Sequence, residues 1–260
     1  MEKDPLVAPV LKWVGGKRQL LAEIKKHIPE DYTTYYEPFL GGGALLFQLQ
    51  PRRAVVNDIN EELINVYKVI RDHVEELIAD LKRHRNEANY FYEIRELDRD
   101  KEKYSRLSRI QRASRILYLN KTCYNGLFRV NQQGEFNAPF GRYKNPNIVN
   151  EKTLRAVSTY FNNNSITFRC DDFQQGVKGI KKGSFVYFDP PYDPVSHSAN
   201  FTGYDKGGFD RQQQIRLKLL CDKLDRQGIK FLLSNSATDF IMDLYRDYQI
   251  TIVQAQRAIN

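Results

Sequence analysis

The 260-residue sequence contains few cysteines and no pair of them at a metal-binding spacing. Its three cysteines, Cys123, Cys170 and Cys221, are odd in number and form no Cys-x-x-Cys pair. This pattern argues against a disulfide framework and against a zinc site. Free thiols fit a reducing compartment, so we expect a cytoplasmic protein.

Signals for a membrane or a metal are lacking as well. The first ten residues, MEKDPLVAPV, have neither the basic start nor the apolar core of a signal peptide, and no apolar run is long enough to cross a bilayer. The four histidines are scattered along the chain. We therefore expect no membrane partner and no metal ligand set.

Positive charge, by contrast, is concentrated in one part of the sequence. The chain has 40 Lys and Arg against 32 Asp and Glu residues, a net charge of +8, and residues 81–150 hold 15 of the basic and 7 of the acidic ones. The excess belongs to this stretch, because the remainder is balanced. Two interpretations stay open: a solvated helical face, or a module that faces the phosphates of a nucleic acid.

Helix-like and strand-like segments alternate along the chain. Apolar residues at helical spacing predict helices over 16–28, within 61–122 and over 210–226. Short apolar runs predict strands at 53–57, 165–170, 184–188, 229–233 and 248–253. This order predicts an α/β fold with a mainly parallel, doubly wound sheet, into which a basic helical stretch is inserted.

A glycine-rich turn, Gly41-Gly42-Gly43, follows the aromatic run from Thr34 to Glu37. Consecutive glycines let the backbone approach a ligand closely, although an ordinary strand-to-helix loop has the same composition. The next strand ends at Asp58, where a carboxylate can accept hydrogen bonds from both hydroxyls of a ribose. The spacing is short for a nicotinamide cofactor and no GxxxxGK[ST] phosphate loop occurs, which favours a nucleoside ligand without a pyrophosphate.

The most specific motif is Asp189-Pro190-Pro191-Tyr192, which follows the apolar run from Phe185 to Phe188. Two successive prolines hold the backbone extended and supply no N–H donors. The Asp189 carboxylate and the Pro190 carbonyl then form a group of acceptors at the end of a strand, and Tyr192 can stack on a planar ring. The alternative is a strand-terminating turn with a surface aromatic residue.

Such a group of acceptors suits the exocyclic amine of a nucleobase. The lone pair of that amine is delocalised into the ring, and two acceptors on its N–H groups would localise it and aim it at an electrophile. A sulfonium methyl group held at the glycine turn would be that electrophile. Proximity and alignment can contribute on the order of 7–11 kcal/mol to such a step.

The segment 127–143 differs from the helices around it. Two aromatic and β-branched runs flank Gln132-Gln133-Gly134, which predicts a β-hairpin. Arg129 and Asn131 are two residues apart, so on a strand both point to one face. Arginine reads guanine and asparagine reads adenine through paired hydrogen bonds. A polar surface hairpin without a ligand is the alternative.

Residues that flank this segment fit a duplex substrate. An adenine amine lies inside the base stack of duplex DNA, so the base must be extruded before it can react. Tyr124 could wedge into the gap, although ordinary core packing explains it equally well. Arg142 and Lys144 are placed to contact phosphates.

Taken together, these motifs resemble those of the Dam-type DNA adenine-N6 methyltransferases, including members of restriction systems that recognise GATC. The resemblance extends over nearly the whole chain and is carried by Lys12-Trp13-Val14-Gly15-Gly16-Lys17, Glu37 to Gly43, Asn57-Asp58, Tyr124 to Asn131, residues 134–143 and Asp189 to Tyr192.

The resemblance implies a Rossmann-like methyltransferase sheet formed by residues 1–60 and 161–260. A mostly helical DNA-recognition domain, which carries the hairpin, would be inserted at 61–160. S-adenosylmethionine would be the methyl donor, and double-stranded DNA would be the substrate, methylated at 5′-GATC-3′ sites. The enzyme would be cytoplasmic and associated with the nucleoid. A cognate restriction endonuclease would be a functional and not a physical partner.

Roles for individual residues follow from the motifs and from the resemblance. The expected catalytic residues are Asp189, Pro190, Pro191 and Tyr192. The expected cofactor-binding residues are Trp13, Lys17, Glu37, Pro38, Phe39, Gly41, Gly43, Asp58, Asp172, Phe173 and Asp189, with Phe173 packed on the adenine of the cofactor. The expected DNA-binding residues are Lys12, Tyr124, Asn125, Leu127, Arg129, Asn131, Pro139, Arg142 and Lys144, with Tyr124 as the intercalating aromatic residue.

Two further expectations concern the second half of the chain. Residues 195–208 have the composition of a flexible loop that would close over the target base. Members of the family continue past the position of Asn260 into a Gly/Ser/Lys-rich loop and one more strand, so the last strand of the sheet would lie beyond this sequence.

Two alternatives to this function stay open from the sequence. One keeps the chemistry but changes the substrate to DNA cytosine N4 or to an RNA base. The other is a sequence-specific DNA-binding protein with a vestigial catalytic pocket, against which the intact motif at Asp189 argues.

Overall fold

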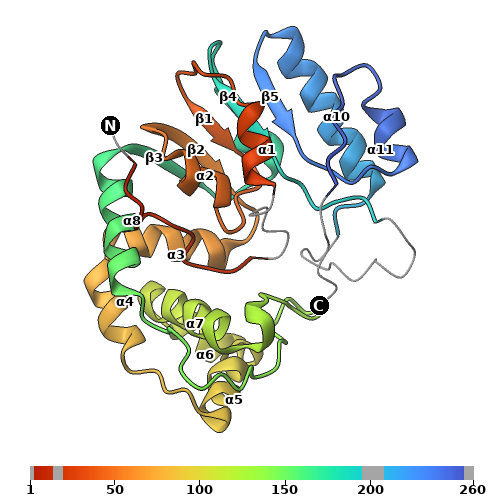
Figure 1. The fold of residues 1–260 in the computed structure, drawn as a ribbon. Coiled ribbons are helices and arrows are strands. Elements are labelled where there is room, and N and C mark those ends of the chain that lie inside the picture. The colour runs from red at the N-terminus through yellow and green to blue at the C-terminus, as the bar shows by residue number, and fades with distance from the viewer. Residues whose placement is uncertain (1–2, 14–19, 195–207, 255–260) are drawn as a thin grey trace.

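The protein is built on a five-stranded, all-parallel sheet. The computed structural model describes residues 3–13, 20–194 and 208–254, which are drawn in colour in Figure 1. The strand order is β3-β2-β1-β4-β5. The strands are β1 (Tyr35–Glu37), β2 (Arg53–Asn57), β3 (Ser165–Arg169), β4 (Phe185–Phe188) and β5 (Lys230–Leu233).

This strand order contains a topological switch point. From β1 the chain moves outward through β2 to β3, and then returns to the other side of β1 to form β4 and β5. The loops that follow β1 and β4 therefore diverge at the carboxyl edge of the sheet. In open α/β sheets, ligands bind in the crevice that opens at such a point.

Both faces of the sheet are covered, because the strand side chains alternate between two hydrophobic clusters. Tyr35 and Tyr187 belong to one cluster, and Tyr36 and Val186 belong to the other. Buried strands of a parallel sheet are apolar on both faces, which explains the continuous apolar sequence of β4. The expected doubly wound arrangement is confirmed.

The two clusters assign the helices to their faces. The cluster around Tyr35 includes apolar residues of α1 (Leu21–Lys26), α2 (Ala44–Leu49), α3 (Glu61–Asp72) and α8 (Glu151–Asn163). The cluster around Tyr36 includes residues of α9 (Phe173–Gly176), α10 (Arg211–Arg226) and α11 (Asp239–Leu244).

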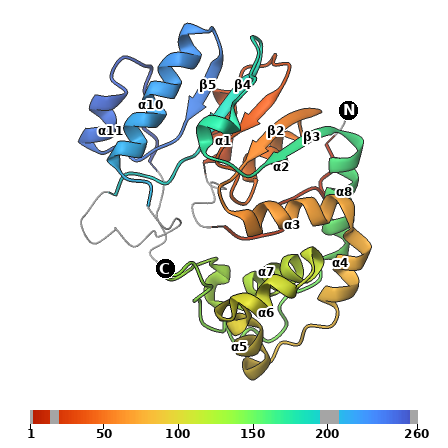
Figure 2. The same ribbon diagram turned by 180° about the vertical axis from the view of Figure 1, so that it is seen from behind.

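A group of helices lies beyond α3, on the side away from the sheet (Figures 1 and 2). It comprises α4 (Val74–Leu81), α5 (Ala88–Glu96), η1 (Leu97–Arg99), α6 (Lys101–Arg106), α7 (Arg109–Thr122) and the 3-10 turn η2 (Tyr124–Gly126). The central helix of this group, α7, begins in a capping box in which Ser108 and Gln111 satisfy each other's backbone N–H groups.

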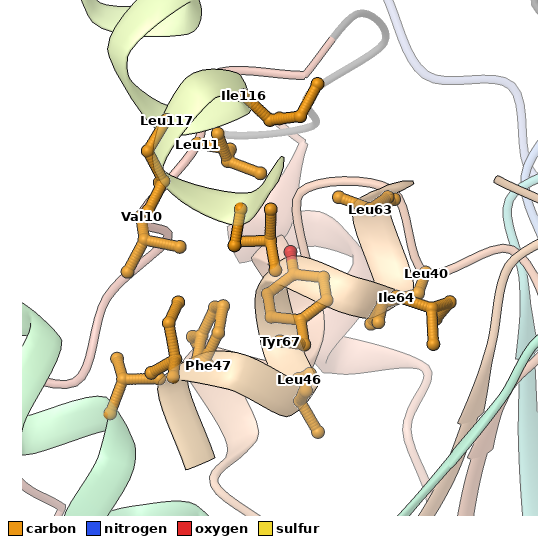
Figure 3. Packing of buried hydrophobic residues seen from close by; sticks show 14 of the residues in the cluster. Val10, Leu11, Leu40, Leu46, Phe47, Leu63, Ile64, Tyr67, Ile116 and Leu117 are labelled. Atoms are coloured by element: carbon orange, nitrogen blue, oxygen red, sulfur yellow. The ribbon is translucent and has the colours of Figure 1, made fainter. Parts of the chain in front are cut away.

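The hydrophobic core continues from the sheet into this group. Around Tyr67 of α3, Figure 3 shows Leu46 and Phe47 of α2 on one side, and Val10 and Leu11 of the N-terminal segment beside α7 on the other. Residues of the segment 127–143, such as Phe128 and Phe136, belong to the same cluster. The segment is thus attached to the sheet through packed side chains.

Most of the predicted elements are confirmed, and two differ. The run 248–253 forms no strand and leaves Ile250, Ile252 and Val253 exposed, because no described strand pairs with it. In the segment 127–143, a single antiparallel bridge between Val130 and Phe136 stands in place of two regular strands. Among the described residues, no helix is both long and apolar enough to span a membrane.

Candidate functional site

Polar loops gather at the carboxyl edge of the sheet and line one continuous hollow. Pro38 follows β1, Asp58 follows β2, Asp172 follows β3, Asp189 follows β4 and Asn235 follows β5, and all of them border this hollow. Strands that run in parallel bring residues that are far apart in the sequence to this one edge. The loops at the switch point thus border a single hollow.

The glycine turn after β1 is tightly constrained. Gly41 and Gly43 have φ angles of 48° and 66°, in the left-handed region that favours glycine. A Cβ atom on Gly41 would lie 3.0 Å from Cδ1 of Trp13, and one on Gly42 would lie 3.2 Å from Cβ of Trp13. The Tyr67 hydroxyl donates a hydrogen bond to the Gly41 carbonyl at 2.8 Å. The turn therefore has room for a backbone and for nothing larger beside Trp13.

Asp58 connects this turn to the next strand. Its Oδ2 accepts a hydrogen bond from the Gly41 N–H at 2.9 Å, and its Oδ1 accepts one from the Asn60 N–H at 3.0 Å. The two backbone N–H groups thus fix the orientation of a carboxylate at the edge of the hollow.

Asn57 is a site residue whose role the sequence did not reveal. Its buried amide donates to the carbonyls of Pro38 and Asp171 at 3.1 and 2.8 Å, and its Oδ1 accepts from the Asp171 N–H at 3.0 Å. It therefore holds together the loops that follow β1, β2 and β3. The signal in the sequence was a polar residue directly after the apolar run from Ala54 to Val56.

Glu37 lies beneath the glycine turn and is buried. Burial raises its pKa well above the usual range, and the nearby Asp189 and Asp58 carboxylates raise it further, while a hydrogen bond from the Tyr35 hydroxyl at 2.9 Å opposes the shift. The site thus contains a carboxyl group that is harder to ionise than that of an exposed glutamate.

An aromatic group forms one wall of the hollow. Phe39 and Phe173 are stacked with ring centroids 5.4 Å apart, and Phe209 packs edge-on against Phe39 at 5.5 Å. The Arg216 guanidinium lies over the Phe173 ring at 5.1 Å and forms an ion pair with Asp172 at 3.1 Å. Phe209 and Arg216 were not expected from the sequence, because both follow Asp172 by more than thirty positions in the chain.

The corner Asp189-Pro190-Pro191-Tyr192 lies directly after β4, the strand that neighbours β1, and borders the same hollow as the glycine turn. Pro190 is buried, and Asp189, Pro191 and Tyr192 are partly exposed toward the hollow. The next residue, Asp193, is buried and accepts hydrogen bonds from the Thr238 hydroxyl at 2.7 Å and from Nε of Arg211 at 3.2 Å. The corner is therefore anchored on its C-terminal side.

Of the predicted DNA-binding residues, Lys12 and Leu127 line the hollow, and Tyr124 lies just after the end of α7. Tyr124 is 57% exposed, which decides against ordinary core packing for this side chain. The buried Asn120 of α7 donates to the carbonyls of Lys12 and Gly126, at 2.8 and 2.9 Å, and accepts from the Lys12 N–H at 2.9 Å. Lys12 and the turn after Tyr124 are thus fixed to one helix.

Arg129 and Asn131 are both engaged within the segment 127–143. Nε of Arg129 donates to Oδ1 of Asn137 at 2.8 Å. The Asn131 amide donates to Glu135 at 2.8 Å and its Oδ1 accepts from the N–H groups of Gln133 and Glu135 at 3.0 Å each, which closes the turn. Arg129 and Asn131 therefore differ in the described structure. Arg129 is exposed and hydrogen-bonded to Asn137, whereas the side chain of Asn131 closes its own turn.

The structure brings many of the predicted site residues together, but not all of them. Those that line the hollow are Lys12, Trp13, Glu37, Pro38, Phe39, Gly41, Asp58, Leu127, Asp172, Phe173 and the corner from Asp189 to Tyr192. Those outside its lining are Gly43, Tyr124, Asn125, Arg129, Asn131, Pro139, Arg142 and Lys144. Lys17 and nearly all of the predicted closing loop 195–208 lie outside the described residues.

Comparison with known proteins identifies the family. Residues 13–259 match the D12 class of N6 adenine-specific DNA methyltransferases. The chain belongs to this family. It is therefore an enzyme that methylates adenine in DNA, which decides against the cytosine, RNA and vestigial alternatives, and the family implies S-adenosylmethionine as the methyl donor.

Relatives of this methyltransferase include proteins of bacteria and archaea. It is 45% identical to the type II methyltransferase M1.LlaDCHI of Lactococcus lactis over 96% of this chain and 88% of the relative. It is 42% identical to the type II methyltransferase M.MjaIII of Methanocaldococcus jannaschii, over 98% and 93%. It is 33% identical to the DNA adenine methylase of Escherichia coli K12, over 96% and 88%.

Proposed function

We propose that this D12 class methyltransferase methylates the N6 amine of adenine in 5′-GATC-3′ sites of duplex DNA, after extrusion of the target base. One observation carries the proposal: the Asp189 corner and the glycine turn border the same hollow on opposite sides of the switch point. An amine donor at the corner and a nucleoside at the turn would therefore face each other.

The residues around the glycine turn fit S-adenosylmethionine. Gly41 and Gly42 leave a close backbone approach beside Trp13, and Asp58 presents a fixed carboxylate for the ribose hydroxyls. Phe39 and Phe173 offer an apolar wall for the adenine ring of the cofactor. When bound there, S-adenosylmethionine supplies an electrophilic methyl group.

The corner would hold the extruded adenine. The Asp189 carboxylate and the Pro190 carbonyl would accept hydrogen bonds from the N6 amine, and Tyr192 would stack on the ring. Tyr124 is exposed at the start of η2, where it can fill the gap that the base leaves in the duplex. Extrusion costs a few kcal/mol, which such contacts offset.

Arg129 would be the main base-reading residue of the segment 127–143. Nε and Nη2 of its guanidinium donate to Oδ1 and to the carbonyl of Asn137, at 2.8 and 3.2 Å, and its Nη1 group would donate to a guanine. Asn131 would contribute indirectly, because its hydrogen bonds to Gln133 and Glu135 fix the turn of the segment that carries Arg129. Arg142 and Lys144, which are both exposed, would contact phosphates.

Residues 1–60 and 161–260 would form the catalytic domain, and residues 61–160 would form the DNA-recognition domain. Two relatives are named type II methyltransferases, which supports a further proposal that this enzyme protects DNA from a cognate restriction endonuclease. Protection of methylated DNA from an endonuclease that is blocked by methylated GATC would test this role.

The decisive experiment is transfer of labelled methyl groups from S-adenosylmethionine to DNA, followed by mapping of the methylated adenines in a bacterial genome. We expect methylation at GATC sites and at least a hundredfold less activity for Asp189→Ala. Methylation at another site would overturn the proposed specificity, and equal activity of Asp189→Ala would overturn the proposed corner.

A further inference from the structure

A glutamine occupies a core position of α10. The buried face of this helix consists of Gln214, Leu217, Leu220, Cys221 and Leu224, at helical spacing. Gln214 has no exposed surface. An amide in such a place costs free energy unless its polar atoms are hydrogen-bonded, so a glutamine here in place of a leucine has to be explained by its partners.

Those partners belong to the catalytic corner. Nε2 of Gln214 donates a hydrogen bond to the Pro191 carbonyl at 2.9 Å, and its Oε1 accepts one from Nδ2 of Asn235 at 2.9 Å. Oδ1 of Asn235 accepts from the N–H groups of Asp193 and Ser236, at 3.2 and 2.9 Å. The two side-chain amides thus form a chain of hydrogen bonds that runs from the Pro191 carbonyl through Gln214 and Asn235 to the Asp193 N–H.

This chain holds the backbone on both sides of Tyr192. The carbonyl immediately before Tyr192 and the N–H immediately after it are both bound by the amide pair. The hydroxyl of Ser236 also donates to the Asp193 carbonyl at 2.6 Å. Since Pro190 and Pro191 have no N–H groups, the corner has few backbone donors with which to fix itself to the sheet.

We propose that Gln214 and Asn235 are positioning residues for methyl transfer, which set the orientation of the corner through the backbone at Pro191 and Asp193. This inference rests on the proposed role of the corner in holding the adenine. Neither side chain needs to touch the substrate. A misplacement of about 1 Å in such a site can reduce a rate by about a hundredfold.

The first test compares two glutamine-to-methionine variants of the same helix. Gln214→Met keeps the volume and removes both hydrogen bonds, whereas Gln212→Met changes an exposed glutamine two residues earlier. We expect single-turnover methylation of a GATC duplex to slow by about 10- to 100-fold in Gln214→Met, with S-adenosylmethionine affinity within about twofold of the original. Gln212→Met should match the unaltered enzyme.

A second variant separates positioning from general stability. Gln214→Glu keeps an acceptor for Asn235 but, when ionised, turns an oxygen toward the Pro191 carbonyl. Once protonated, the same group can donate again, and burial favours the protonated form. We expect the activity deficit of this variant, relative to the unaltered enzyme at each pH, to shrink as the pH falls. If Gln214 served only folding stability, the single-turnover rate of the folded variant would equal that of the unaltered enzyme at every pH.

The outcomes distinguish this inference from the proposed function. Absence of methylation at GATC by the unaltered enzyme would contradict the proposed function itself. An active enzyme that retains its single-turnover rate in Gln214→Met would overturn the positioning role alone. If Gln214→Met does not fold, a pH-independent ratio for Gln214→Glu would overturn the role in its place.

Discussion

Trp13 stacks on Phe128 with ring centroids 4.5 Å apart and an interplanar angle of 18°. Trp13 also packs against Gly41 and Gly42 of the glycine turn, and Phe128 lies one residue before Arg129. A single aromatic pair thus connects the proposed cofactor pocket with the proposed base-reading segment.

We expect Phe128→Leu to weaken binding at both sites. Aromatic pairs contribute roughly 0.5–1.5 kcal/mol beyond their buried area. Loss of the stacking on Trp13 should therefore lower S-adenosylmethionine affinity by roughly 2- to 12-fold, even though Phe128 itself lies in the proposed DNA-binding segment. Trp13 is the only tryptophan in the sequence, so its fluorescence reports directly on this contact. Phe140→Leu, in the same segment but packed on Phe91, serves as the control. Unchanged cofactor affinity in Phe128→Leu would refute the connection.

We expect Gly41→Ala to lower S-adenosylmethionine affinity by more than about tenfold. The new methyl group would press on Trp13, and the left-handed backbone would add strain of roughly 1–2 kcal/mol. Gly179→Ala is the matched control, because Gly179 has a φ of 79° and no atom within 4 Å of the added Cβ. Calorimetric titration measures the affinities. A similar loss in both variants would mean that backbone strain, and not contact with Trp13, is responsible.

A buried ion pair is hydrogen-bonded to the backbone of the segment 127–143. Arg115, whose side chain is 3% exposed, pairs with Asp98 at 2.9 Å, and Asp98 accepts a hydrogen bond from the Phe136 N–H at 2.8 Å. Asp98→Ala would leave the guanidinium buried without its carboxylate, so we expect a loss of about 3–5 kcal/mol in the free energy of unfolding. Urea unfolding measures it.

The control for this variant is Asp243→Ala, which removes an exposed ion pair with Arg246. An exposed pair contributes at most about 1 kcal/mol. Equal destabilisation by the two substitutions would contradict the structural role of Asp98.

We expect the stability of the enzyme to decline in mildly acidic solution, partly because of His84. This imidazole is stacked on Tyr118 at 4.4 Å and hydrogen-bonded to Tyr90 and Ser114. Burial lowers its pKa, against a smaller opposing effect of Asp80. In the unfolded chain the pKa returns to about 6.5, so the unfolded state takes up the proton first as the pH falls.

The contribution of His84 is therefore present above about pH 6.5 and is lost below it. The free energy of unfolding should depend less steeply on pH between about 7.5 and 5.5 in His84→Asn than in the unaltered enzyme. Parallel pH dependences in the two proteins would refute this assignment.

Arg129 and Arg142 should differ in their effects on DNA binding. We expect Arg129→Ala to reduce discrimination between GATC and sites with one altered base by about 1–3 kcal/mol. Arg142→Ala should weaken binding to all sequences and lower the slope of affinity against salt concentration by about one. Fluorescence anisotropy at several salt concentrations measures both. Intact site preference in Arg129→Ala would contradict the reading role.

Local patterns predicted the elements of the fold well, but they did not predict every pairing. The alternating residues of 248–253 have the composition of a strand, yet a strand exists only where a neighbour supplies its hydrogen bonds, and no described strand does so. The same limit applies to the segment 127–143, where the turn forms but regular pairing is restricted to Val130 and Phe136.

The sequence by itself determined the chemistry of the site. The prolines after Asp189 and the three glycines after Phe39 restrict the backbone through covalent geometry, which is local and can be recognised from residue order. The family motifs are of this kind, and they lie at the ends of strands that the apolar runs mark clearly.

The tertiary structure alone decided which side chains support that chemistry. Gln214 resembles any other glutamine of an exposed helix until the fold turns it inward to Pro191, and Asn57 becomes a connector only where three loops meet. Their partners are separated from them by many residues, and a long-range hydrogen bond leaves no periodic signal in a single sequence. The switch point brings these groups together because parallel strands must all end at the same edge.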